Sequence, residues 1–388
     1  MTATALPPRP VTEHAAQLAA WLQEHATELA PWRHRATQGI AAAVEHDRGL
    51  LASLHDAGWS RYGWPAETGG LGGPVALRAV LYDELAAADL EVPEAFVILE
   101  TLGPLLAHLA PHLAAVHLPR FLRGDELWGQ GFSEPEAGSD LAHLRTRAVS
   151  DGTGFRVTGQ KVWTTLGQFA SFAAVLARTG AADSAHRGLT MLWVDLAAPG
   201  VTVRPIAAAS GRDEFAEMFF DDVPVPAEGV IGEVGGGWAA AMYLLQYERG
   251  MYAWQRQAVL HRRLRQLAAL VGDDAPSGTD VAALGRAQLL CAGLRARSAT
   301  TVARLSDGEN PGPEISVDKV LLGRCEQAVT DAWRRLRGTD MLLGADDSAI
   351  TGREEWFYSR ASTIFGGAAD IQRDILADRV LDLPRGAR

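Results

Sequence analysis

Glu248 is the residue whose surroundings most suggest acid–base chemistry. Its neighbours three and four positions away along a predicted helix are all apolar: Leu244, Leu245, Met251 and Tyr252. The carboxylate therefore projects from the apolar face of that helix. A carboxylate in such a place can act as a general base. The alternative is a structural glutamate that Arg249 or another partner neutralises.

A segment rich in serine and glycine, residues 130–140 (QGFSEPEAGSD), offers groups that bind anions or polar rings. Ser133 and Ser139 supply hydroxyls, and the glycines expose backbone N–H groups that suit a phosphate. Composition alone favours the plainer interpretation, an ordinary turn.

Trp163 and Thr165 lie on one face of a predicted strand, residues 159–165 (GQKVWTT). A flat aromatic ring beside a hydroxyl could flank a planar cofactor. A tryptophan of the core with a hydrogen-bonded neighbour is the alternative.

Residues 365–379 (FGGAADIQRDILADR) predict a glycine turn that leads into a helix. Asp370 can cap this helix, and Ile371 and Ile375 share one of its faces. The exposed N–H groups at such a start can hold a carbonyl oxygen or a phosphate. A capped helix without a ligand is the alternative.

Metal and thiol chemistry have little support in the chain. His108 and His112 are four residues apart, but Pro111 lies between them and no glutamate follows His108. The two cysteines, Cys291 and Cys325, cannot form a four-ligand zinc site or a disulfide framework. We therefore predict no metal site.

Charge and hydropathy limit the partners of the chain. Its 388 residues carry a formal net charge of −11, which disfavours binding to nucleic acid or to anionic membranes. No apolar run reaches the ~20 residues that a membrane-spanning helix needs. Residues 1–11 lack the pattern of a secretory signal, so we expect a cytoplasmic protein.

The elements that must position these residues follow the order helix, strand, helix. Apolar positions recur at helical spacing up to about residue 125, interrupted by a glycine- and proline-rich loop. Short segments rich in β-branched and aromatic residues then predict an antiparallel sheet or small barrel: residues 155–158, 161–165, 172–177, 189–194, 201–204 and 217–220. A second helical part follows, broken by a linker at residues 306–313. We predict an α+β fold with domains at 1–126, 127–233 and 234–388.

In this order, the motifs resemble those of the acyl-CoA dehydrogenases, which are FAD-dependent flavoproteins. The matching segments extend over nearly the whole chain: 63–72 (GWPAETGGLG), 131–141 (GFSEPEAGSDL), 159–165 (GQKVWTT), 219–226 (FFDDVPVP) and 364–384. The resemblance implies an N-terminal helical domain, a middle β-domain and a C-terminal four-helix bundle. It also implies a homodimer or homotetramer with FAD at a subunit interface.

The resemblance further implies the reaction and the residues that bind the cofactor. The reaction is α,β-dehydrogenation of an acyl thioester on CoA or a carrier protein. A carboxylate takes the α-proton, a hydride passes from the β-carbon to flavin N5, and an electron-transfer flavoprotein is the expected acceptor. The residues expected to contact the flavin and its phosphates are Gln130, Phe132, Ser133, Gly138 and Ser139, with Trp163 and Thr165 against the ring and Asp370 in the tail.

The resemblance places the catalytic base in one of two positions. Many members carry it immediately before the glycine of the tail motif, where this chain has Gly366, which cannot take a proton. A second group carries a glutamate followed by arginine on the helix that enters the C-terminal bundle. Glu248 and Arg249 match that arrangement, so we predict Glu248 as the base, Arg249 as its positioning residue and Gly366 as a backbone N–H donor to the thioester.

Some of the expected contacts to FAD are missing from the sequence. Residues 284–301 lack the Arg-x-x-Phe-Gly motif that reaches the FAD of a partner subunit, and Ala368 replaces a threonine that usually binds FAD. Each lost hydrogen bond weakens binding by about 0.5–1.5 kcal/mol. One alternative follows: a non-catalytic or weakly FAD-binding subunit of a heteromer. A separate alternative keeps the fold and the flavin but passes the electrons to oxygen, as in an acyl-CoA oxidase-like flavoenzyme.

Overall fold

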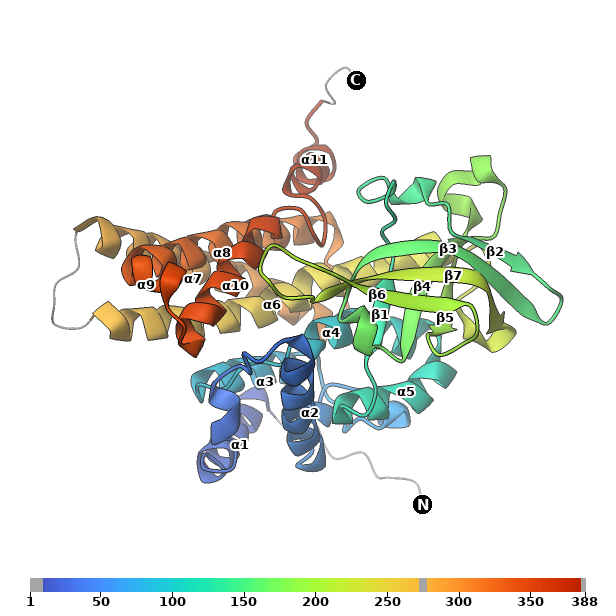
Figure 1. Cartoon of the computed structure of the whole chain (residues 1–388). Helices are drawn as coiled ribbons and strands as arrows, with labels where there is room; N and C mark the ends of the chain where they lie inside the picture. The colour runs from blue at the N-terminus through green and yellow to red at the C-terminus, as the bar shows by residue number, and fades with distance from the viewer. Residues whose placement is uncertain (1–9, 272–277, 385–388) are drawn as a thin grey trace.

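The computed structural model describes residues 10–271 and 278–384. Residues 1–9, in which we predicted no signal, lie outside the described part. The observed order is helical, then β, then helical, so the α+β fold is confirmed (Figure 1). Short 3-10 helices join the longer elements: Ala30–Arg33, Trp59–Arg61, Ala66–Thr68, Leu141–His143, Gly167–Phe169, Ala182–Gly188, Ala227–Gly229 and Gly312–Ile315.

The N-terminal part packs five helices around an apolar core. They are α1 (Val11–Glu24), α2 (Ile40–Asp56), α3 (Ala76–Ala87), α4 (Ala95–Leu109) and α5 (Pro111–Arg123). The sequence of α4, AFVILETLGPLLAHL, is apolar on nearly all sides, and most of this helix is accordingly buried. It therefore forms the centre of the helical layer, next to α6 and the sheet.

The glycine- and proline-rich loop at residues 63–72 is part of this core. Trp64 is buried against Gly103 of α4, where an added Cβ would come within 2.6 Å of the ring. The guanidinium of Arg78 lies 4.0 Å from the centre of the same ring and forms an ion pair of 3.1 Å with Glu100. The Tyr82 hydroxyl donates to the other Glu100 oxygen at 2.5 Å. The motif thus ties α3 and α4 together.

The middle part is an open sheet with order β6-β7-β3-β2-β4-β5-β8, with β1 paired to β4. The strands are β1 (Trp128–Gly131), β2 (Arg147–Ser150), β3 (Gly154–Thr165), β4 (Phe172–Arg178), β5 (Leu189–Asp195), β6 (Val201–Ile206), β7 (Phe215–Pro226) and β8 (Val230–Ile231). Two of the predicted strands join into the single strand β3. Most pairs are antiparallel as predicted, but β1 and β2 pair parallel to β4.

The C-terminal part contains three long helices, α6 (Gly237–Val271), α7 (Gly278–Ser306) and α8 (Ser316–Arg337). The shorter helices α9 (Thr339–Leu343) and α10 (Asp347–Ala361) complete the bundle. The predicted linker separates α7 from α8. Helix α11 (Ala369–Arg379) projects from the bundle and contacts α8 (Figure 1). Within the described ranges, no helix is long and apolar enough to cross a membrane.

Candidate active site

Glu248 lies where three distant segments of the chain meet. It projects from α6 and is half-buried, and the Gln130 amide of β1 donates to its Oε2 at 3.2 Å. Gly366, in the turn before α11, has φ +63°, and a Cβ added there would lie 3.0 Å from Glu248 Oε1. The two positions at which the resemblance allows a base therefore converge on one point.

Two polar side chains with buried, unpaired atoms lie against this turn. An added Cβ at Gly367 would lie 3.6 Å from Arg249 Nη2 and 2.5 Å from Gln372 Nε2. Burial lowers the pKa of Arg249, partly opposed by the charge of Glu248. Arg249 Nε and both amide atoms of Gln372 have no hydrogen-bond partner among the described residues. Polar groups left unpaired inside a protein are rare, so these atoms point to a missing ligand or partner.

Lys319 of α8 was not predicted and lies on the other side of the same turn. Its Nζ donates to the Ser362 carbonyl at 2.6 Å and lies 4.8 Å from the centre of the Phe365 ring. Burial lowers the pKa of Lys319, while Glu326 and Glu248 oppose that shift. No periodicity or motif in the sequence distinguishes this lysine from a surface residue.

A second buried pair joins the two motifs expected to bind the cofactor. Lys161 of β3 is fully buried and pairs with Glu134 at 2.8 Å. Glu134 also accepts from the backbone N–H groups of Arg145 and Thr146. Burial lowers the pKa of Lys161 to about 8 despite the charge of Glu134. In the sequence, this pair appears as no more than one charged residue in each of the two motifs, residues 131–141 and 159–165.

Trp163 lies at an irregular position of β3, where the register against β7 shifts between Lys161 and Thr164. Its φ is +64°, and 58% of the residue is exposed. Thr165 is half-buried beside it, whereas Thr164 between them is buried. An exposed indole held in an uncommon backbone conformation is typical of a ligand-binding position.

The other expected cofactor residues lie in different surroundings. Ser133 is half-buried, and Gly138 and Ser139 are exposed on the loop after β1. Phe132 is buried in the core, and its carbonyl accepts from Lys161 Nζ at 3.0 Å. Asp370 is exposed on α11 and forms an ion pair of 2.6 Å with Arg373.

A cavity begins one helical turn beyond Glu248. Tyr252, Gln255, Arg256 and Val259 of α6 line one side, α10 lines another, and Leu166 marks the end towards the sheet. Aromatic contacts connect the cavity to the turn at Gly366: Trp163 with Phe215, Phe215 with Tyr358 and Tyr358 with Phe365. On α6, the lining residue nearest to Glu248 along the chain is Tyr252, one helical turn away.

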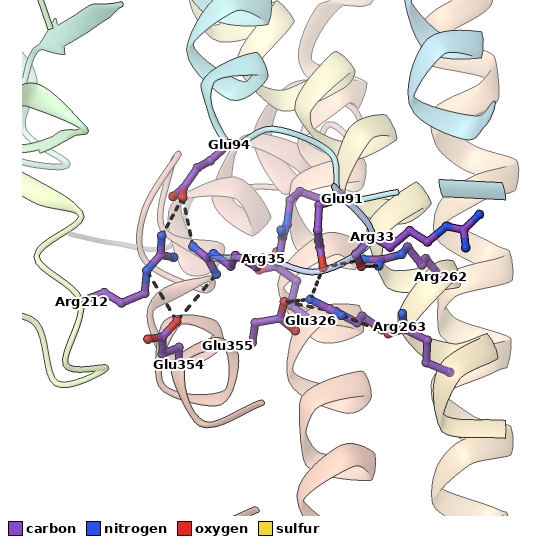
Figure 2. Close-up of polar contacts among 12 residues, drawn as sticks. Arg33, Arg35, Glu91, Glu94, Arg212, Arg262, Arg263, Glu326, Glu354 and Glu355 are labelled. Atoms are coloured by element: carbon purple, nitrogen blue, oxygen red, sulfur yellow. Dashed lines mark hydrogen bonds and ion pairs between the residues drawn. The ribbon is translucent and has the colours of Figure 1, made fainter. Parts of the chain in front are cut away.

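The far end of this cavity is charged. Arg35 and Arg212 meet between Glu94 and Glu354, and Arg262 and Arg263 both contact Glu91 (Figure 2). Burial raises the pKa of Asp47 to about 7, and burial together with Glu94 raises the pKa of Glu214 to about 8.

Comparison with known proteins identifies the family. Family models for the N-terminal, middle and C-terminal domains of acyl-CoA dehydrogenases match residues 12–125, 129–223 and 235–381. The chain is 37% identical over 387 residues to "Acyl-CoA dehydrogenase IpdE1" of Mycobacterium tuberculosis, covering 97% of this chain and 99% of the relative. The chain belongs to the acyl-CoA dehydrogenase family. It is therefore a flavin-dependent oxidoreductase of lipid metabolism that acts on acyl-CoA with FAD.

Solved structures of this acyl-CoA dehydrogenase family have the same fold. The structure named "Tcur3481-Tcur3483 steroid ACAD" matches with TM-score 0.82 and 26% identity, covering 99% of this chain and 100% of that one. The ChsE4-ChsE5 complex from Mycobacterium tuberculosis matches with TM-score 0.79 and 27% identity, covering 99% and 100%.

The residues around the site fit an FAD. The exposed indole of Trp163 offers a flat surface, and nothing lies within 4 Å of a Cβ added at Gly138, which leaves its backbone open to a phosphate. The unpaired amide of Gln372 lies at the turn beside Gly367. In the described part of the chain, no group of three or more His, Cys, Asp or Glu side chains could hold a metal ion.

Proposed function

We propose that Glu248 is the general base of α,β-dehydrogenation in this acyl-CoA dehydrogenase. The observation that carries this proposal is the short distance, 3.0 Å, between Glu248 Oε1 and the place that a Cβ added at Gly366 would occupy. A carboxylate at either position would reach the same α-carbon, and only Glu248 supplies one. The Gln130 amide bond to the second oxygen fixes the direction of the carboxylate.

Residues at and beside the turn prepare the substrate and hold the cofactor. The N–H of Gly366 points to the thioester carbonyl and stabilises the charge that develops there as the α-proton leaves. Arg249 lies against Gly367 and holds the turn beside the base. The chemistry that a bound FAD would supply is acceptance of the hydride from the β-carbon. The residues that would hold the FAD are Trp163, Thr165, Ser133, Gly138 and Ser139, with Asp370 as an outer contact.

Gly366→Ala is expected to lower turnover without unfolding the protein. The new methyl group would lie 3.0 Å from Glu248 Oε1, in a left-handed conformation that favours glycine. Displacing the N–H and the carboxylate together should reduce kcat about tenfold to a hundredfold. Steady-state kinetics with a good substrate, beside the FAD content of each preparation, measures this. An unchanged kcat would contradict the role given to the turn.

We further propose a ring-bearing acyl-CoA as the substrate class. The support is one structural relative whose name includes a steroid acyl-CoA dehydrogenase, together with the wide spread of elements around the cavity. Anaerobic addition of cyclic and straight-chain acyl-CoAs to the flavin-loaded enzyme tests this. Bleaching of the flavin by cyclic substrates at lower concentrations is expected. Turnover with an artificial acceptor, with and without oxygen, separates a dehydrogenase from an oxidase.

The chain is proposed to work with a second, similar chain. Ile364, Ile371 and Leu381 are exposed on the turn, on α11 and just after it, and such a concentration of apolar side chains is typical of an interface. Two structural relatives bear names that join a pair of chains. A partner would also supply the FAD contacts that the sequence lacks.

Purification from the native source is expected to yield a hetero-oligomer with more FAD per mole than the chain produced alone. Light scattering and the flavin absorbance measure both quantities. Ile371→Asp should weaken the assembly at least tenfold, whereas Leu289→Asp, on an exposed position of α7, should not. A fully flavin-loaded, active homo-oligomer would contradict the heteromer.

A further inference from the structure

The far end of the cavity combines charged groups with a buried acceptor, the side-chain oxygen of Gln255. Gln255 of α6 lines the cavity and is only 2% exposed, and its Nε2 donates to the Pro93 carbonyl at 3.4 Å. Within residues 10–271 and 278–384, no group donates a hydrogen bond to its Oε1. A buried acceptor of this kind is costly unless a ligand or a water supplies the donor.

The charged side chains around Gln255 are already paired with one another. Arg35 contacts Glu94 at 3.2 Å, Arg212 contacts Glu94 and Glu214 at 3.3 and 3.4 Å, and Arg256 contacts Glu326 at 2.7 Å. These arginines are therefore not available for a carboxylate group of a substrate.

The net charge of the lining also disfavours a charged ligand. Arg262 and Arg263 neutralise Glu91 and Glu355 from behind. The pKa of Asp47 is raised to about 7, so this carboxyl is divided between its charged and neutral forms near pH 7. The pKa of Glu214 is raised to about 8, so that carboxyl is largely protonated. The remaining carboxylates and guanidinium groups balance, so neither an anion nor a cation is attracted. A neutral group that donates a hydrogen bond fits this end.

Gln255 lies on the same face of α6 as Glu248, two helical turns further along. An acyl group whose α-carbon is at Glu248 would extend past Tyr252 to reach Gln255. Together with the proposed function, on which this inference rests, the geometry points to an acyl-CoA whose far end carries a hydroxyl group that donates to Gln255 Oε1. A purely alkyl end would leave this buried acceptor without a donor.

The test compares two acyl-CoAs that differ in one hydroxyl, 3-cyclohexylpropanoyl-CoA and 3-(4-hydroxycyclohexyl)propanoyl-CoA, with the flavin-loaded holoenzyme. We expect kcat/KM to be at least about tenfold higher for the hydroxylated compound, because a site built for a hydroxyl rejects the analogue that lacks it. Gln255→Leu should bring the ratio close to one. Gln255→Glu, which keeps an acceptor, should retain the preference, and Gln288→Leu on the exposed face of α7 is the matched control.

The outcomes separate this inference from the proposed function. Bleaching of the flavin by both compounds with equal kcat/KM would overturn the inference and leave the dehydrogenase intact. A preference that persists unchanged in Gln255→Leu would also overturn it. Failure of both compounds to bleach the flavin would refute the proposed substrate class, and the inference with it.

Discussion

Glu248→Gln should reduce turnover at least a thousandfold while leaving the fold and the FAD content intact. The amide has the shape of the carboxylate and still contacts Gln130, but it cannot accept the α-proton. General-base catalysis contributes about 10²–10⁴-fold, and the other position at which the resemblance allows a base, residue 366, is a glycine. The measurement is the rate of flavin bleaching in a single anaerobic turnover.

Glu233→Gln is a suitable control, because Glu233 is an exposed glutamate just before α6 and should keep full activity. Substrate binding, followed by the shift of the flavin spectrum, should change little in Glu248→Gln. Normal bleaching in Glu248→Gln would show that the base lies elsewhere and would return the partner-subunit alternative to consideration.

Arg78→Met is expected to destabilise the protein by about 3–5 kcal/mol. The substitution removes the only basic partner of Glu100 among the described contacts and leaves that carboxylate charged or protonated inside the N-terminal core. Burial already raises the pKa of Glu100, and Arg78 opposes that shift. The change should appear as a fall of several degrees in the thermal midpoint of the flavin-loaded protein.

The double variant Arg78→Met/Glu100→Leu separates charge from packing. Removing both charges of a buried pair is often nearly neutral, so this variant should recover most of the lost stability. Arg335→Met, which breaks a pair at 3.6 Å between the exposed Arg335 and the half-buried Asp280, should change stability by less than about 0.5 kcal/mol. A double variant as unstable as Arg78→Met would show that packing against Trp64, rather than charge, dominates.

The sequence allowed the fold to be predicted because the fold depends on local patterns, and local patterns also led to the prediction of Glu248 as the base. Strand-like segments in the sequence predicted β3–β7, and helical periodicity predicted the helical N- and C-terminal parts of the chain. The apolar neighbours of Glu248 indicated that its carboxylate projects from an apolar helix face. The strands β1, β2 and β8 were not predicted, since two to four residues are too short for a periodicity. The parallel pairing of β1 with β4 also depends on contacts distant in sequence.

The charged end of the cavity could not be predicted for a similar reason. Its members come from the segment after α1, from α2, from residues 91–94, from the loop before β7, and from α6 and α10. Taken alone, each of these segments has the composition of an ordinary solvent-exposed stretch of chain. The pairing of Lys161 with Glu134 was missed in the same way, because a lysine inside a strand is usually expected to face water.

Both ends of the proposed acyl site, Glu248 and Gln255, lie on the single uninterrupted helix α6. A rise of 1.5 Å per residue sets the separation between the levels of Glu248 and Gln255 at about 10 Å. This separation works as a molecular ruler: an acyl group that is too short cannot engage both ends at once, and one that is too long must fold back. Chain-length selectivity in this enzyme would then be encoded in helical register, and inserting or deleting a single turn of α6 between the two residues would reset it.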